Sequence, residues 1–517
     1  MTLLIRVYRS GKLIQEINAT PGEMLLQSIN SVEPCIDAPC GGKGRCGKCI
    51  VRLGPGSEEV LACRTPVDRD MDVYLPEESS MKIAESGTPV ENAKARERTQ
   101  SAKLGVAIDI GTTTVVAHLT DIASGKRIAT ASGANAQRAY GADVISRIQY
   151  CVENGHEMLT QLLREQLSSL IRHTCTVSGE RPRDIGYISI AANTIMEHLA
   201  AGFSPAGMGV APFTPVDLFG EEVPVWEGLL AAKAAKVFFA PAISSYVGGD
   251  ITAGMFAAGL EETSGPAIFL DIGTNGEIAM KYGDTYYCCS TAAGPAFEGA
   301  EITMGMAAVV GAINHVKWDD GLKFTVIGDK DPRGLCGSGL LDALAVMIRN
   351  GAVDETGRLL DAHEVSPRIS EHVGKVDGKN VFWLTKGEGG VYMSAQDIRK
   401  LQLAKSAIAA GIQTLLHHAG ITEDQVESFV LAGGFGSYMD KYSAARIGMF
   451  PISFLPKTQT LGNTAGEGAA LALCSESARA ALTSIRDRCK YIELSRSPVF
   501  IEQFVEQMMF DVFSTEG

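Results

Sequence analysis

The sequence lacks an apolar run long enough to cross a membrane. Across its 517 residues, no stretch approaches the roughly 18 consecutive apolar residues that suggest a spanning helix. The apolar run at the N-terminus is interrupted by Arg6, which argues against the uncharged core of a signal peptide. We therefore expect a cytoplasmic protein with no membrane partner.

The sequence also lacks an excess of positive charge. It has 46 Lys and Arg against 60 Asp and Glu, a formal net charge of −14. Nucleic-acid phosphates favour a basic surface, so a nucleic-acid partner is not expected. Hydrophobic residues make up 45% of the chain and charged residues 21%, which is typical of globular proteins. The length exceeds one compact core and predicts several domains.

The cysteines gather at one end of the chain. Five of the twelve lie within the first 63 residues, and clustered cysteines in a cytosolic protein indicate metal ligands rather than disulfides. Cys40, Cys46, Cys49 and Cys63 have the spacing C-x5-C-x2-C-x13-C, and the first three lie in a glycine-rich segment. Glycines let such a loop wrap closely and direct backbone N–H groups at sulfur. We predict that these four residues hold a [2Fe–2S] cluster. Cys35 is expected to be a bystander.

A structural zinc site with four cysteine ligands is the alternative. The lack of a second matching C-x2-C pair argues against it. The gap between Cys40 and Cys46 has five residues, one more than the corresponding gap in plant-type ferredoxins.

The N-terminal 77 residues have the order of a β-grasp ferredoxin. Apolar runs at 3–8 and 13–17 predict a hairpin. Thr20 and Glu23 form a capping-box pattern that predicts a short helix to about Asn30. Residues 78–103, rich in charge, are expected to be a linker.

From residue 104 the pattern becomes α/β, and one turn occurs twice. Asp-Ile-Gly-Thr follows an apolar strand at Asp109 and again at Asp271. Glycine lets the backbone approach an anion, and N–H and hydroxyl groups can donate to phosphate. The predicted phosphate-binding residues are Gly111, Thr112, Thr113, Gly273, Thr274 and Asn275. Because Mg²⁺ prefers oxygen ligands, Asp109 and Asp271 are predicted to hold it through water.

A long amphipathic helix is predicted near the end of the chain. Ser394 and Asp397 form its N-terminal cap, apolar residues follow at helical spacing, and it ends at Gly420.

The paired turns and three further segments resemble the superfamily of actin, sugar kinases and heat-shock ATPases. Residues 248–254 are similar to the first connecting helix, 431–437 to the adenosine loop with Gly433 and Gly434, and 462–470 to the second connecting helix. The resemblance implies a duplicated actin-like (ribonuclease H-like) ATPase fold. It also implies that Asp250 lies near the attacking water; a simple helix cap is the alternative role for this residue. The expected halves are 104–245 and 246–475, followed by a strand–helix extension at 476–517.

The whole chain resembles the reductive activators of corrinoid proteins, in which a [2Fe–2S] domain precedes such an ATPase. Residues 135–144, 290–299 and 334–340 also look like that family. The resemblance implies ATP-dependent electron transfer from the cluster to inactive Co(II), which regenerates Co(I) for methyl transfer. It implies a [2Fe–2S] cluster, ATP and Mg²⁺ as cofactors. The expected partners are a corrinoid protein and a low-potential electron donor, and a homodimer is a reasonable expectation.

Three other functions stay open at this point. An activator of an iron–sulfur dehydratase uses the same ATPase fold to inject electrons, but without a matching fused ferredoxin domain. A small-molecule kinase with an accessory redox domain would phosphorylate an acceptor. An actin-like assembly protein would sediment in an ATP-dependent way.

Overall fold

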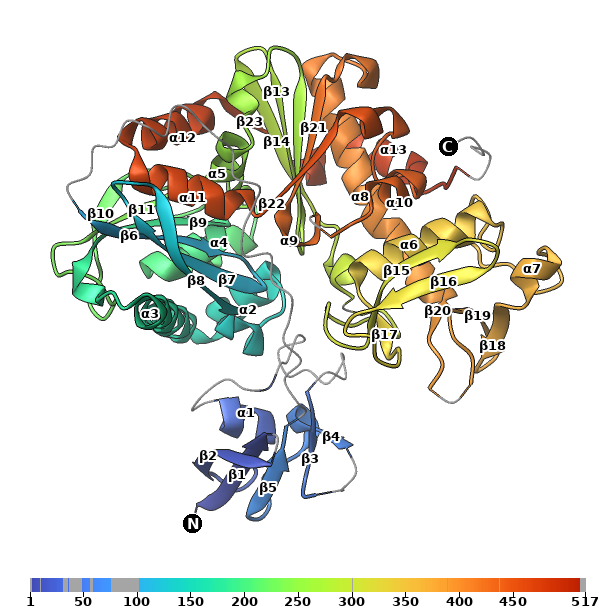
Figure 1. Cartoon of the computed structure of the whole chain (residues 1–517), viewed down its shortest axis with the longest axis horizontal. Coiled ribbons are helices and arrows are strands. Elements are labelled where there is room, and N and C mark those ends of the chain that lie inside the picture. The colour runs from blue at the N-terminus through green and yellow to red at the C-terminus, as the bar shows by residue number, and fades with distance from the viewer. Residues whose placement is uncertain are drawn as a thin grey trace.

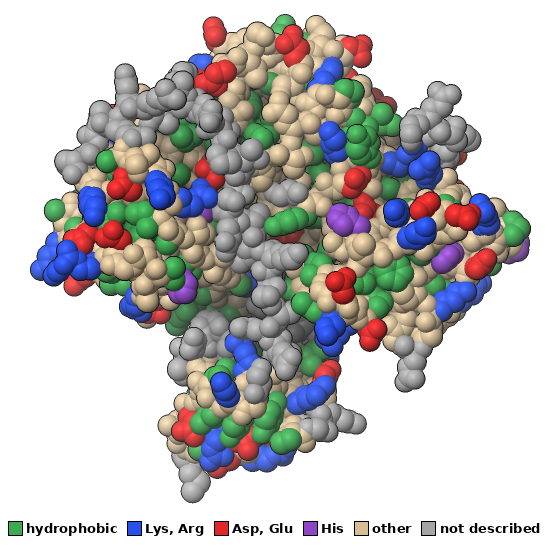
Figure 2. Space-filling model, in the orientation of Figure 1, with side chains coloured by type: hydrophobic (Ala, Val, Ile, Leu, Met, Phe, Trp, Pro, Cys, Tyr) green, Lys and Arg blue, Asp and Glu red, His purple; other side chains and the backbone are tan. Residues whose placement is uncertain are grey.

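A computed structural model of the chain describes residues 2–9, 11–30, 36, 49–55, 59–75, 102–299, 301–387, 389–436 and 438–511. They form an N-terminal domain and two larger lobes (Figure 1). Within these residues, no helix combines the length and the apolar character needed to cross a bilayer. Acidic and basic side chains are interspersed on the face seen in Figure 2.

The N-terminal domain is a five-stranded sheet with the strand order β2-β1-β5-β3-β4. Its elements are β1 Leu3–Arg9, β2 Lys12–Ala19, α1 Leu25–Asn30, β3 Ile50–Arg52, β4 Glu59–Leu61, the 3-10 turn η1 Ala62–Arg64 and β5 Met71–Tyr74. β1 pairs antiparallel with β2 and parallel with β5. The side chains of Ile5, Val7, Leu25 and Val73 form its fully buried core. This is the predicted β-grasp arrangement, with a hairpin before the helix.

Helix α1 begins later than the capping-box pattern predicts. The N–H groups of Gly22 and Leu25 donate to the carbonyls of Val67 and Thr65, each at 2.8 Å. The backbone before Leu25 is therefore paired with the segment around residue 66. The Thr20 N–H still donates to the Glu23 carboxylate at 3.3 Å. Tertiary pairing thus overrides the local helix signal.

The first lobe is built on a six-stranded sheet of order β10-β11-β9-β6-β7-β8. Its elements are β6 Leu104–Ile110, β7 Thr114–Asp121, β8 Lys126–Ala134, η3 Ala136–Ala139, α2 Val144–Asn154, α3 Glu157–Ser178, η4 Pro182–Asp184, β9 Ile185–Ala192, α4 Thr194–Ala201, η5 Ala206–Gly209, β10 Glu222–Pro224 and β11 Lys236–Phe239. Leu159, Leu163, Leu167 and Ile171 form the buried stripe of α3 at helical spacing. This stripe packs α3 on β7 and β8.

The second lobe repeats this sheet, with the order β22-β21-β12-β13-β14-β23. Its strands are β12 Ala267–Ile272, β13 Gly276–Tyr282, β14 Thr285–Thr291, β21 Ser428–Ala432, β22 Thr458–Gly462 and β23 Cys489–Tyr491. β6 and β12 each continue into an antiparallel hairpin and pair on the other side with a parallel strand, β9 or β21. The duplication expected from the paired turns is confirmed.

The lobes are joined by two helices whose backbones pack closely against each other. α5 is Gly249–Ala257 and α11 is Thr464–Cys474. A Cβ on Gly468 would lie 2.2 Å from the Ala253 carbonyl oxygen, and one on Gly254 would lie 3.0 Å from Thr464 Oγ1. Glycine at these two contacts therefore permits the close approach of α5 and α11.

The remaining elements include two further three-stranded sheets, which are yellow and orange in Figure 1. They are η6 Leu260–Glu262, η7 Pro295–Glu298, β15 Ala312–Trp318, β16 Leu322–Val326, β17 Gly334–Leu335, α6 Gly337–Arg349, α7 Pro367–Ser370, β18 Val373–Val376, β19 Lys379–Trp383, β20 Tyr392–Ser394, α8 Ala395–Ala419, η8 Glu423–Gln425, α9 Gly433–Gly436, α10 Lys441–Arg446 and η9 Ile452–Lys457. The predicted α8 is confirmed: Ser394 and Asp397 form a capping box, and Gly420 is the left-handed C-cap.

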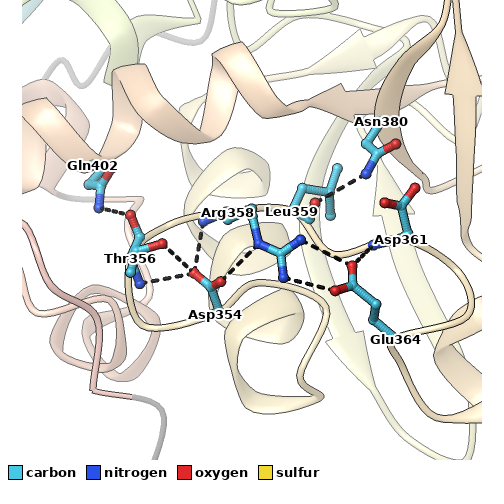
Figure 3. A network of polar contacts seen from close by, with 8 residues as sticks. All are labelled: Asp354, Thr356, Arg358, Leu359, Asp361, Glu364, Asn380 and Gln402. Atoms are coloured by element: carbon cyan, nitrogen blue, oxygen red, sulfur yellow. Dashed lines mark hydrogen bonds and ion pairs between the residues drawn. The ribbon is translucent and has the colours of Figure 1, made fainter.

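The last described elements are α12 Glu476–Arg488, β23, η10 Leu494–Arg496 and α13 Pro498–Glu506. β23 pairs parallel with β14 at the sheet edge. After α13, the backbone at 507–510 is held by α8: Gln402 Nε2 donates to the Met508 carbonyl at 2.6 Å and Lys405 Nζ to the Met509 carbonyl at 2.8 Å. Gln402 also donates to the Thr356 carbonyl at 2.9 Å, in the turn that Arg358 braces through Asp354 and Glu364 (Figure 3).

Candidate nucleotide site

The two Asp-Ile-Gly-Thr turns face each other. Asp109 and Asp271 are the next-to-last residues of β6 and β12. Each turn then closes with a backbone hydrogen bond of 2.9 Å, from Gly111 N–H to the Thr114 carbonyl and from Gly273 N–H to the Asn275 carbonyl. The hydroxyl oxygens of Thr113 and Thr274 lie 3.5 Å apart although 161 residues separate them. The structure thus brings the predicted phosphate residues of both turns to one place.

The first turn is braced from behind by neighbouring elements. The Asn135 side chain donates to the Gly111 carbonyl at 2.8 Å. Asn193, the N-cap of α4, donates to Thr112 Oγ1 at 3.1 Å. The buried Arg147 of α2 donates to the Thr112 carbonyl at 2.5 Å. These contacts hold the turn in place. Through Asn135, they also give part of the 135–144 segment a structural role.

Three aspartates form an electrostatically coupled cluster at this site. Burial raises the pKa of Asp271 to about 6. Burial and the nearby Asp271 charge raise the pKa of Asp109 to about 7. Burial and then the charges of Asp271 and Asp109 raise the pKa of Asp250 to about 8. Like charges held close in a partly buried site favour a bound cation, which would relieve their repulsion.

The donor set suits Mg²⁺ bound through water. Carboxylate and hydroxyl oxygens are the ligands that this ion prefers, and it usually keeps several waters. Across the described ranges, no three His, Cys, Asp or Glu side chains converge closely enough to hold a metal ion directly.

Asp250 lies in the first turn of α5 but is not its cap. The N-cap is Gly248, which provides no side-chain hydrogen bond, and Asp250 Oδ1 accepts from the Ile251 N–H at 2.9 Å. A Cβ on Gly248 would lie 2.5 Å from the Ala192 carbonyl oxygen. Two consecutive glycines therefore let the helix start against β9 and place Asp250 beside the other two aspartates.

The predicted adenosine loop touches the second aspartate. Gly433 follows β21 with φ of +87°, and a Cβ there would lie 2.4 Å from Asp271 Oδ1. A Cβ on Gly434 would meet nothing within 4 Å.

Asn463, the N-cap of α11, hydrogen-bonds Asp109 and so lowers the pKa of that carboxyl against the effect of burial. Both connecting helices therefore begin at the aspartate cluster.

Two glutamates at the site were not predicted. Burial and the charges of Asp250 and Asp271 raise the pKa of Glu277 on β13 well above its usual range, and Ser290 donates to this carboxyl at 3.2 Å. Glu298, in η7, accepts hydrogen bonds from Thr113 and Thr274. Glu298 lies within the 290–299 segment singled out in the sequence, but its contacts depend on both lobes.

The described part of the cysteine cluster lies in the core of the N-terminal domain. Cys49 is 1% exposed and Cys63 is 8% exposed. The Ala62 N–H donates to the Cys49 carbonyl at 2.8 Å, next to the pairing of Ile50 with Leu61. This ladder brings the two cysteines to the same end of the β3–β4 pair. Two buried thiols so placed suit a thiolate-bound cluster. Cys40 and Cys46, like Cys35, lie outside the described residues.

Comparison with known proteins accounts for almost the whole chain. Residues 104–263 match a family model described as the RACo middle region, and residues 265–516 match the C-terminal domain of RACo, the ASKHA domain. The corrinoid activation enzyme RamQ of Eubacterium limosum is 31% identical, over 96% of this chain and 98% of RamQ.

Two more relatives carry related descriptions. The Co(II) methylated amine-specific corrinoid protein reductase of Methanosarcina barkeri is 25% identical, over 70% of this chain and 68% of its own length. A solved structure of a reductive activator for corrinoid, iron–sulfur protein is 29% identical and superposes with a TM-score of 0.70, over 99% of this chain and 100% of that one. With its duplicated lobes and paired turns, this chain belongs to the family of reductive activators of corrinoid proteins.

Proposed function

We propose that this protein uses ATP to drive the reduction of a corrinoid protein from inactive Co(II) to Co(I), which can accept a methyl group. The observation that carries the proposal is the presence, in one chain, of a β-grasp domain with two buried candidate thiolate ligands and of two lobes whose Asp-Ile-Gly-Thr turns meet. The 96% coverage by RamQ includes both parts. A relative matched only in its ATPase lobes would not support an electron-transfer role.

Four cysteines would hold the cluster in this proposal. Cys49 and Cys63 are the described pair, and Cys40 and Cys46 complete the spacing in the sequence. When bound, a [2Fe–2S] cluster supplies one-electron transfer at low potential. Burial of Cys49 and Cys63 in the apolar core keeps water from that side of the site, which is one of the factors that set such a potential.

The nucleotide would lie between the lobes. Asp109 and Asp271 are proposed to hold Mg²⁺ through water, and Asp250 is proposed to orient the attacking water. Gly111, Thr112 and Thr113 of one turn, with Gly273, Thr274 and Asn275 of the other, are the proposed phosphate-binding residues. Gly433 and Gly434 are proposed to leave room for adenosine. These roles are supported by the convergence of both turns, the three aspartates and the adenosine loop.

Energetics explain why such a reaction would need ATP. Plant-type ferredoxins have potentials of roughly −400 mV, and each 59 mV of mismatch changes a one-electron equilibrium constant about tenfold. Closure of the two lobes on ATP can favour a state of the docked partner that accepts an electron more easily. Hydrolysis would then release the partner. A low-potential electron donor and a homodimer complete the proposal.

The direct test is spectroscopic. The full-length protein with its cluster is mixed with a reductant and a Co(II) corrinoid protein, and Mg·ATP is added while the Co(I) absorption band is followed. We expect Co(I) to form only with ATP, and to be lost in Asp109→Ala and Asp271→Ala. Asp284→Ala, an exposed aspartate in the β13–β14 turn, is the control and should behave as wild type.

Two results would overturn this function. Co(I) formation that is equally fast without ATP would remove the proposed coupling. A phosphorylated small-molecule acceptor, formed at the rate of ATP consumption, would instead establish the kinase alternative.

A further inference from the structure

Glu298 occupies the space between the two phosphate turns. Its Oε1 accepts from Thr274 Oγ1 at 3.0 Å, and its two carboxylate oxygens lie 3.3 and 3.4 Å from Thr113 Oγ1. One turn belongs to the first lobe and the other to the second. A single carboxylate therefore bridges the lobes at the point where the proposed phosphate donors meet.

Glu298 and a bound phosphate would compete for the same two threonine hydroxyl groups. Each threonine hydroxyl has one hydrogen to donate. While Thr113 and Thr274 donate to Glu298, neither can donate fully to a phosphate oxygen. The carboxylate is also an anion, so it repels an incoming polyphosphate in a partly buried site. Phosphate binding at both turns therefore requires Glu298 to leave.

The same short turn also contacts the opposite end of the site. Phe297 stacks on Phe435 of the adenosine loop, with ring centroids 5.6 Å apart and an interplanar angle of 11°. A Cβ on Gly337 would lie 1.7 Å from the Phe297 carbonyl oxygen. The turn is thus fitted closely between α6 and the adenosine loop, so a backbone shift at Glu298 would also move its neighbours.

The residues that follow Glu298 contact α8 and the sheet of β15, β16 and β17. The Thr303 N–H and hydroxyl donate to Asp397 Oδ1 at 2.8 and 3.0 Å, at the capping box of α8. The Met306 N–H donates to the Leu335 carbonyl at 2.9 Å, beside β17. Residues 296–299 and 301–306 therefore lie between the phosphate turns, α8 and the sheet of β15, β16 and β17.

We propose that Glu298 is a positioning residue that the nucleotide displaces: its carboxylate competes with phosphate for Thr113 and Thr274, and its release repositions residues 296–299 and 301–306. This inference rests on the proposed function, since it assumes that the nucleotide binds at the paired turns. It adds a route by which nucleotide binding changes the structure at the outer surface of the second lobe.

The first test measures nucleotide affinity in the full-length protein. Glu298→Gln keeps the size of the side chain but removes its charge, which makes it a weaker acceptor. We expect the Kd for Mg·AMPPNP to fall about tenfold, because a hydrogen bond to a charged group is the stronger competitor. Glu301→Gln, an exposed neighbour in the same segment, should leave the Kd unchanged. An unchanged or higher Kd in Glu298→Gln would overturn the proposal.

The second test follows hydrogen exchange in peptides that cover residues 301–306. In wild type, Mg·AMPPNP should raise the exchange of this segment several-fold. Nucleotide-free Glu298→Gln should already exchange at the nucleotide-bound rate. No change in wild type on adding the nucleotide would refute the displacement, even if the variant failed to fold.

Neither measurement involves a corrinoid protein. Failure of the proposed reduction of cobalt would therefore leave these results interpretable, and the loss of nucleotide effects in an active reductase would refute only the role of Glu298.

Discussion

Gly433 lies directly against Asp271. Its φ is +87°, and a Cβ at this position would lie 2.4 Å from Asp271 Oδ1. A left-handed conformation costs an L-residue about 1–2 kcal/mol before any clash is counted. The predicted adenosine loop and the second phosphate turn are thus packed so closely that the Asp271 side chain leaves no room for a side chain at position 433.

We therefore expect Gly433→Ala to weaken nucleotide binding at least tenfold, because the new methyl group must push Asp271 or the loop out of place. Gly434→Ala is a matched control in the same loop, since its Cβ would meet no atom within 4 Å. Isothermal titration with Mg·AMPPNP compares the two variants. Equal affinities would show that the contact with Asp271 is irrelevant to binding.

Asp250→Asn separates a role in hydrolysis from a role in folding. Because Asp250 is not the N-cap of α5, its replacement should leave the melting temperature within a few degrees of wild type. If it orients the attacking water, kcat for ATP hydrolysis should fall about 10²–10⁴-fold, as for other general acid–base groups, while the Kd for Mg·AMPPNP changes little. A loss of stability with normal turnover would return Asp250 to a structural role.

Replacement of the predicted cysteine ligands tests the proposed cluster. Cys49→Ser and Cys63→Ser should lose iron and the visible absorption of the protein, because a [2Fe–2S] centre needs four thiolates. Cys175→Ser, a buried thiol on α3, should retain both. Metal analysis that found one zinc and no iron in wild type would replace the cluster with a structural zinc site.

Lys405→Met tests how the C-terminal segment is held. Lys405 is 1% exposed, and its Nζ donates to the carbonyls of Gln507 and Met509. Methionine fills a similar volume but leaves both carbonyls without this donor, at a cost of about 1–3 kcal/mol. The expected results are a lower free energy of unfolding and faster proteolysis after α13. Lys379→Met, at an exposed position that begins β19, should show neither change.

Lys405 also predicts a pH dependence of stability. Burial lowers its pKa from 10.5 to about 7 in the folded protein. Between about pH 7 and 10 the unfolded chain therefore binds more protons at this residue, so its contribution to the free energy of unfolding rises with pH. Denaturation of wild type and Lys405→Met from pH 6.5 to 9.5 should show a stability difference that grows with pH. A constant or shrinking difference contradicts the prediction.

Much of the fold could be predicted from local patterns. The first hairpin, helix α8 with its capping box, and the two Asp-Ile-Gly-Thr turns each depend on residues close together in the chain. The start of α1 was wrong because Gly22 and Leu25 pair with residues 65–67, and no local pattern records that pairing. Helix α12 was likewise not anticipated within the predicted C-terminal extension.

The sequence by itself determined which chemical groups this protein has: a run of spaced cysteines, two copies of a phosphate-type turn, and glycines where connecting helices begin. Those features depend on residue type and spacing, which are local properties. Only the tertiary structure decided that Asp250 lies beside Asp109 and Asp271, that Gly433 lies against Asp271, and that Glu298 bridges Thr113 and Thr274. Each of these contacts joins strands or helices that are distant in the chain, and they arise because two duplicated sheets pack around α5 and α11.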